Sequence, residues 1–105
     1  MIRIANLRNV KLNPNEILIK VDRSSILGNP FYMHNESERN SVCDQYESYF
    51  NNIIAHKNDP NNTAFMNELR RIYKIAKNND IVLGCWCYPK RCHSETIKRF
   101  LEQYI

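Results

Sequence analysis

An almost unbroken apolar run, Ile81 to Cys87, decides the class of fold that this chain can adopt. It lies between Asn78-Asn79-Asp80, which would end a helix, and Pro89, so it is too short to be a helix itself. It also lacks the polar and apolar alternation of a strand with one face in water. A run of this kind is typical of a central strand that is buried on both faces, as in the sheets of α/β proteins.

Two further strands are predicted near the N-terminus. Residues 2–5 alternate isoleucine with Arg3 and Ala5, which indicates a short first strand. Glu16 to Asp22 is a dense apolar run that only Lys20 interrupts. We therefore predict a second strand here, covered on most of both faces.

Three amphipathic helices are predicted from apolar residues that recur every three or four positions. The first would begin at Ser37, a plausible N-cap, and end before Lys57. The second would begin at Asn62 or Thr63, and the third near Cys92 to Ser94. Their apolar stripes are formed by Val42, Tyr46, Tyr49, Phe50, Ile53 and Ile54, by Phe65, Leu69, Ile72, Tyr73 and Ala76, and by Ile97, Phe100, Leu101 and Tyr104.

The order of these elements, β-β-α-α-β-α, predicts one small α/β domain over residues 1–105. Its sheet would have about three strands, mostly parallel, flanked by the three helices, because two helices separate the second strand from the third. The direction of the first strand is left open. The loops Arg23–Phe31 and Tyr88–His93 would leave from one edge of the sheet, where α/β proteins bind ligands. The two glycines, Gly28 and Gly84, belong to these segments, where we expect positive φ or a close backbone approach.

Charge and composition bear on the partners of the protein and on the compartment in which it works. The net charge of +4 is mild for a protein dedicated to duplex nucleic acid. The longest apolar run is far short of the roughly 20 residues of a membrane span, and no leader is evident, so we expect no membrane partner. The four cysteines fit reduced thiols in a cytoplasmic compartment better than disulfides. Abundant Asn, Ile and Lys suggest an AT-rich phage or viral genome, in which case the location is the host cytoplasm.

Two motifs in this chain resemble those of a known family. They are Leu27-Gly28-Asn29-Pro30-Phe31 and Cys85-Trp86-Cys87-Tyr88-Pro89 with Cys92-His93, and between them lie Arg39, Val42 and Tyr46. Together they resemble a small domain-of-unknown-function family of phages, large viruses and bacteria, with paired LGNPF and CWCxPxxCH motifs. The likeness covers nearly the whole chain from Val21 onward, although that family has glycine where this chain has Asp22 and Ser94. It implies the architecture and the site, but no established activity.

Our main hypothesis is that the loop edge binds an anionic, phosphorylated or nucleotide-related small molecule without a cofactor. The last helix would offer N–H groups and a positive dipole to the anion. Single-stranded nucleic acid would use the same features. The residues predicted to bind are Arg23, Gly28, Asn29, Arg39, Trp86, Lys90, Arg91 and Ser94. The plainer interpretation is a solvated basic face, with Arg39 paired to Glu36 or Glu38.

Two alternatives concern the cysteines. Cys85, Cys87, Cys92 and His93 have the side chains that zinc prefers, which would fix a loop of a non-enzymatic module that contacts protein or nucleic acid. Their spacing lacks a CxxC knuckle, however, and Cys85 and Cys87 also fit as small buried apolar residues. In the other alternative the protein is an enzyme. Cys92 would be the nucleophile and His93 its proton carrier, because a helix N-terminus and nearby cations lower a thiol pKa.

Overall fold

The computed structural model describes residues 1–105 without a gap, and its elements follow the predicted order β-β-α-α-β-α. The 3₁₀ helices η1 (Glu36–Glu38) and η2 (Pro60–Asn62) precede the first two α-helices. The strands and α-helices are β1 (Ile2–Asn6), β2 (Glu16–Lys20), α1 (Arg39–Ala55), α2 (Thr63–Asn78), β3 (Asp80–Cys85) and α3 (Ser94–Glu102). None of the helices has the length and apolar character needed to cross a membrane.

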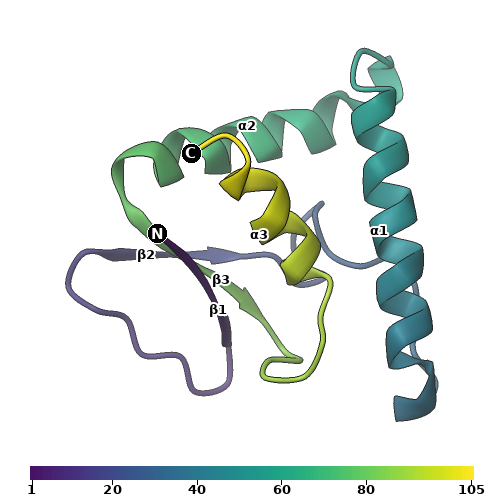
Figure 1. Cartoon of the computed structure of the whole chain (residues 1–105), viewed down its shortest axis with the longest axis horizontal. Coiled ribbons are helices and arrows are strands. Elements are labelled where there is room, and N and C mark those ends of the chain that lie inside the picture. The colour runs from purple at the N-terminus through teal and green to yellow at the C-terminus, as the bar shows by residue number, and fades with distance from the viewer.

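The sheet has β3 in its centre, between β1 and β2 (Figure 1). Both neighbours run parallel to β3, with Ile4 and Ile19 each opposite Leu83. All of β3 from Ile81 to Cys85 is buried. The prediction of a parallel sheet around this central strand is therefore confirmed, and the first strand, whose direction was open, is parallel too.

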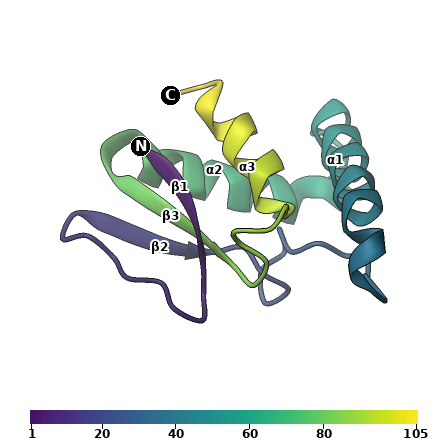
Figure 2. The ribbon, with the colours of Figure 1, turned by 60° about the horizontal axis from the view of Figure 1, so that its bottom comes forward.

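α2 and α3 pack against one face of the sheet, whereas α1 stands to the side of the strands (Figure 2). Ile81 and Leu83 point to this face and join residues such as Tyr46, Leu69 and Ile97, one from each α-helix, in a core of sixteen buried residues. Figure 2 shows α3 alongside β1 and α2 behind the strands. On the other face, the side chain of Leu7 covers Gly84, where an added Cβ would lie 2.5 Å from Leu7 Cδ2. Gly84 thus serves a close approach, and its φ is not positive.

Three local expectations were wrong. β2 pairs only with β3 and is therefore an edge strand, in which only Ile19 is buried, so it is not covered on most of both faces. β3 ends at Cys85, which leaves Trp86 and Cys87 in the following loop. Ser37 is not the N-cap of a helix. The side chain of Asn35 accepts a hydrogen bond from Ser37 N at 3.0 Å and caps η1, and α1 begins only at Arg39.

Candidate functional site

The loops that follow β2 and β3 meet at one edge of the sheet. We call this the carboxyl edge, and it comprises the strand ends at Asn6, Lys20 and Cys85 with loop residues 21–31 and 86–93. His93 Nε2 lies 2.5 Å from the carbonyl oxygen of Val21, and the indole Nε1–H of Trp86 donates to Asp22 Oδ2 at 2.9 Å. These two hydrogen bonds join segments of the chain that are more than sixty residues apart.

Residues that the sequence analysis did not select hold this edge together. The side-chain amide of Asn6, at the end of β1, donates to the carbonyl oxygens of Trp86 at 3.2 Å and Tyr88 at 3.0 Å. The hydroxyl of buried Tyr46 donates to the carbonyl oxygen of Leu27 at 2.8 Å. Only one signal in the sequence could have revealed the residues that hold the edge together. A polar residue stands at the end of the first strand, Asn6, and another shortly after the second, Asp22.

His93 is buried and neutral. Its side chain is only 7% exposed, and the ring of Tyr46 packs against it edge-on with centroids 4.9 Å apart. A carbonyl oxygen can only accept, so the proton of the imidazole lies on Nε2, facing Val21, and Nδ1 is free to accept from the Cys92 thiol at 3.3 Å. Burial lowers the pKa of His93 because the charged ring would lose its hydration. The carbonyl of Val21 therefore orients the imidazole ring.

Cys85, Cys87 and Cys92 lie at the end of β3 and in the loop that leads to α3. The Cys92 thiol lies 3.3 Å from His93 Nδ1, and the hydroxyl of Ser94 donates to Cys85 Sγ at 3.7 Å. Side-chain interactions with Cys85 and Cys87, together with burial, raise the pKa of Cys92. Cys92 is the predicted nucleophile, and of the three thiols it is the one that holds its proton most firmly.

The same contacts favour a thiolate at Cys87. Hydrogen bonds from Cys92 and from the guanidinium of Arg39 lower the pKa of Cys87 to about 5. The pKa of Cys85 is also lowered, again through Cys92 first. Cys85 is 1% exposed, whereas Cys87 is partly exposed. Cys87 is therefore the more accessible of the two thiols with a lowered pKa.

The zinc alternative requires Cys85, Cys87, Cys92 and His93 to surround one point. No group of three or more His, Cys, Asp or Glu side chains in the chain is arranged to hold a metal ion. Both ring nitrogens of His93 are already engaged, one by the Val21 carbonyl and the other by the Cys92 thiol.

Three of the predicted anion-binding cations are paired with carboxylates. Arg39 donates from Nε and Nη2 to Glu36 at 2.8 and 2.7 Å, and its Nη1 donates to the carbonyl of Arg91 at 3.0 Å. Lys90 reaches Glu36 at 3.3 Å, and Arg91 reaches Asp44 at 2.8 Å. Hydrogen bonds from Arg39 and then Lys90 lower the pKa of Glu36 to about 2. The pairing of Arg39 with Glu36 is the contact that the plainer interpretation expected.

Arg23 differs because it has no carboxylate partner. Its Nε donates to the carbonyl of Asn29 at 3.2 Å, and its guanidinium carbon lies 4.2 Å from the centre of the Tyr32 ring. Asn29 uses its side chain within the fold, accepting from Phe31 N at 2.9 Å. Gly28 lies against the Asp22 carbonyl so closely that an added Cβ would collide with it. Gly28 and Asn29 therefore shape the loop that presents Arg23.

Trp86 is the exposed aromatic side chain at the centre of this edge. It is 57% exposed even though its indole N–H is fixed to Asp22, and Tyr88 beside it is 46% exposed. Ser94, by contrast, is fully buried and turns its hydroxyl to Cys85. Of the predicted ligand-binding residues, Trp86 and Arg23 are thus the ones that combine exposure with unused stacking or charge.

A comparison with known protein families gives a match over nearly the whole of this fold. Residues 4–103 match the model of a domain of unknown function (DUF4326). The chain belongs to this family. No curated protein and no solved structure matches the chain significantly. The DUF4326 match thus includes the whole carboxyl edge, and it names no activity.

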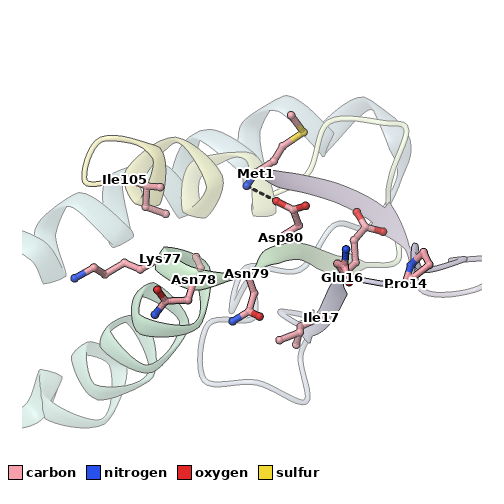
Figure 3. A pocket seen from close by; sticks show the side chains of 11 residues that line it. Met1, Pro14, Glu16, Ile17, Lys77, Asn78, Asn79, Asp80 and Ile105 are labelled. Atoms are coloured by element: carbon pink, nitrogen blue, oxygen red, sulfur yellow. Dashed lines mark hydrogen bonds and ion pairs between the residues drawn. The ribbon is translucent and has the colours of Figure 1, made fainter.

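The DUF4326 domain also has a hollow at the opposite edge of its sheet (Figure 3). Met1, Glu16 and Asp80, at or beside the amino ends of the three strands, contribute to its lining. Both of its side-chain carboxylates are already paired, because Asp80 pairs with the amino terminus at 2.8 Å and Glu16 accepts from Arg3 at 2.7 Å. The candidate functional site therefore remains at the carboxyl edge.

Proposed function

We propose that this DUF4326 domain binds a phosphorylated or nucleotide-related small ligand at its carboxyl edge. Trp86 stacks on a ring of the ligand, and Arg23 neutralises its negative charge. The observation that carries the proposal is an exposed indole, oriented by its hydrogen bond to Asp22, together with the guanidinium of the next residue, Arg23, which lacks a carboxylate partner. Aromatic stacking beside a cation is the usual way in which proteins hold nucleotides without reading their sequence.

The Asp22 contact supports this role for Trp86. A freely rotating exposed indole would lose side-chain entropy on stacking, whereas the hydrogen bond to Asp22 already limits its orientation. The hydrogen bonds from Arg23 to the Asn29 and Phe31 carbonyls do the same for the guanidinium without neutralising it. Both groups are therefore positioned before a ligand arrives, which lowers the cost of binding.

The free thiols support a reducing location. All four cysteines are unpaired. We propose a cytoplasmic protein, in the host cytoplasm if the AT-rich composition reflects a phage or viral gene, and an accessory role there.

The test uses the fact that Trp86 is the only tryptophan in the chain. Its fluorescence is titrated with nucleoside mono-, di- and triphosphates and with a short single-stranded oligonucleotide. At least one of these ligands should quench the fluorescence and raise the thermal midpoint. Arg23→Gln should weaken that ligand about tenfold or more, because a charge-assisted contact contributes about 1.5–3 kcal/mol.

Arg70→Gln is the matched control, since Arg70 is exposed on α2 and also has no carboxylate partner. Its affinity should equal that of the wild type. Equal weakening by both substitutions would mean that only the net charge matters. That outcome, or a panel that leaves the fluorescence and the midpoint unchanged, contradicts the proposal.

A further inference from the structure

We infer that a groove between the three α-helices binds a small amphipathic anion, which is an apolar chain or ring that carries a carboxylate or a similar acidic head. The groove lies where the C-terminal end of α3 meets α2, beside the end of α1 (Figure 1). It shares no residue with the carboxyl edge, so it is a second site, independent of the proposed nucleotide site.

The groove is mainly apolar. Its volume of about 320 Å³ lies within the range of about 300–1,000 Å³ that is usual for small-molecule sites. Such sites are lined by hydrophobic and aromatic side chains with a small number of polar groups. Six of the eight lining residues here are hydrophobic, namely Ile54, Met66, Leu69, Tyr73, Phe100 and Tyr104.

The apolar lining is preformed. Met66 and Leu69 are 7% and 2% exposed and belong to the core, so they cannot move away from the groove without loss of packing. Phe100 packs against Tyr104 with ring centroids 5.1 Å apart, and the hydroxyl of Tyr73 donates to the Tyr104 carbonyl at 3.3 Å. An apolar ligand would therefore release water from this surface without first having to order it.

The charge of the groove is entirely positive. Its two remaining lining residues are Lys57 and Arg70, and no acid contributes to it. Neither cation forms an ion pair, and Arg70 donates to Asn67 Oδ1 at 3.4 Å. Lys77 adds to the positive field, because its Nζ lies 5.5 Å from the centre of the Tyr73 ring. The complement of an apolar groove with unpaired cations is an apolar molecule with a negative head.

The length of the groove favours a small molecule over a protein helix. Its lining along α2 runs from Met66 to Tyr73, which is about 10 Å at 1.5 Å per residue. A helix that docks in a groove usually places anchors at i, i+3 or i+4 and i+7, and so needs more than two turns of apolar surface. An alkyl chain or an aromatic ring fits the shorter span.

The experiment titrates the full chain with dodecanoate, kept below its micelle concentration, by calorimetry and by nitrogen-15 NMR. We expect saturable binding that shifts the backbone signals of Leu69, Tyr73 and Phe100 and leaves the Trp86 indole unmoved. Decanoate should bind about threefold more weakly or worse, because each fully buried methylene contributes up to about fourfold. Dodecyltrimethylammonium, with the same chain and the opposite charge, should bind about fivefold more weakly or worse, because the cations repel it.

A double variant tests the role of the two cations. Lys57→Gln combined with Arg70→Gln should weaken dodecanoate about fivefold, as expected for the loss of two exposed ion pairs. The matched control is Arg8→Gln combined with Lys11→Gln, which removes the same two kinds of charge from the loop after β1. All four side chains are exposed, so both variants should keep the thermal midpoint of the wild type, and the control should keep its affinity.

Several outcomes would overturn the inference. One is the absence of saturable binding below the micelle concentration. Equal binding of the two amphiphiles, or equal weakening by the two double variants, would show that Lys57 and Arg70 do not select the head group. Shifts centred on the carboxyl edge would place the ligand elsewhere. Binding of a short acidic amphipathic peptide, but not of dodecanoate, would assign the groove to a partner helix. The titrations contain no nucleotide, so they succeed or fail separately from the proposed function.

Discussion

The imidazole of His93, at the start of α3, donates its Nε2 proton to the carbonyl oxygen of Val21, at the end of β2, over 2.5 Å. This buried bond fixes the loop after β3 against the loop after β2. It also sets the tautomer that leaves Nδ1 toward Cys92.

The first prediction concerns pH. Because burial lowers the pKa of His93, the unfolded chain binds a proton on this ring below about pH 6.5 while the folded chain does not. Stability is therefore retained above that pH and lost as the pH falls. The free energy of unfolding should decrease by up to about 1.4 kcal/mol per pH unit as the pH falls below about 6.5.

Urea denaturation at several pH values measures this slope. His93→Gln should flatten it in that window, whatever the stability of the variant, and the exposed His56→Gln should leave it unchanged. A slope that survives in His93→Gln would contradict the assignment.

The second prediction compares the two glycines. Alanine at Gly28 would place its Cβ against the backbone of Asp22 and Arg23, whereas at Gly84 it would meet the side chain of Leu7. Backbone cannot move as easily as a leucine side chain, so Gly28→Ala should cost more than Gly84→Ala, with overpacking of this kind costing about 1–3 kcal/mol. Chemical denaturation of both variants measures the difference, and equal losses would count against a rigid loop at Gly28.

The third prediction concerns Glu36, which competes with any anion for Arg39 and Lys90. Glu36→Gln should release both cations and strengthen binding of an anionic ligand a few-fold, since exposed pairs of this kind contribute about 0.2–1 kcal/mol. Titration of Trp86 fluorescence measures the affinity. Glu68→Gln, which breaks the Arg71 pair on α2, is the control that should have no effect. Unchanged or weaker binding by Glu36→Gln would show that Arg39 and Lys90 do not face the ligand.

The fold was largely predictable because its decisive signals are local. The Ile81–Cys85 run and the helical stripes each fix one element, and their order fixes a parallel pairing of β2 with β3. The edge position of β2 was missed because the number of neighbours of a strand is not encoded in its own hydrophobicity. The cap at Asn35 was missed because the 3₁₀ turn before α1 leaves no periodic signal in the sequence.

The sequence predicted the location of the site better than the contacts within it. The two loops meet as expected because parallel strands end at one edge. The partners within the edge could not be foreseen, since Val21 acts through its backbone carbonyl and Asp22 through one contact to a residue far along the chain. The burial of Cys92, which the sequence offered as a reactive thiol, could not be foreseen from its position before the last helix.

The most direct test of the proposed function is a nitrogen-15 NMR titration with the nucleotide that quenches Trp86 fluorescence. The chain has one indole N–H resonance, and its proton is the one that Trp86 donates to Asp22. We expect this resonance to shift on titration together with the backbone signals of Arg23 and of the loop after β3. Shifts confined to the hollow around Met1 and Asp80, with the Trp86 indole unmoved, would contradict binding at the carboxyl edge.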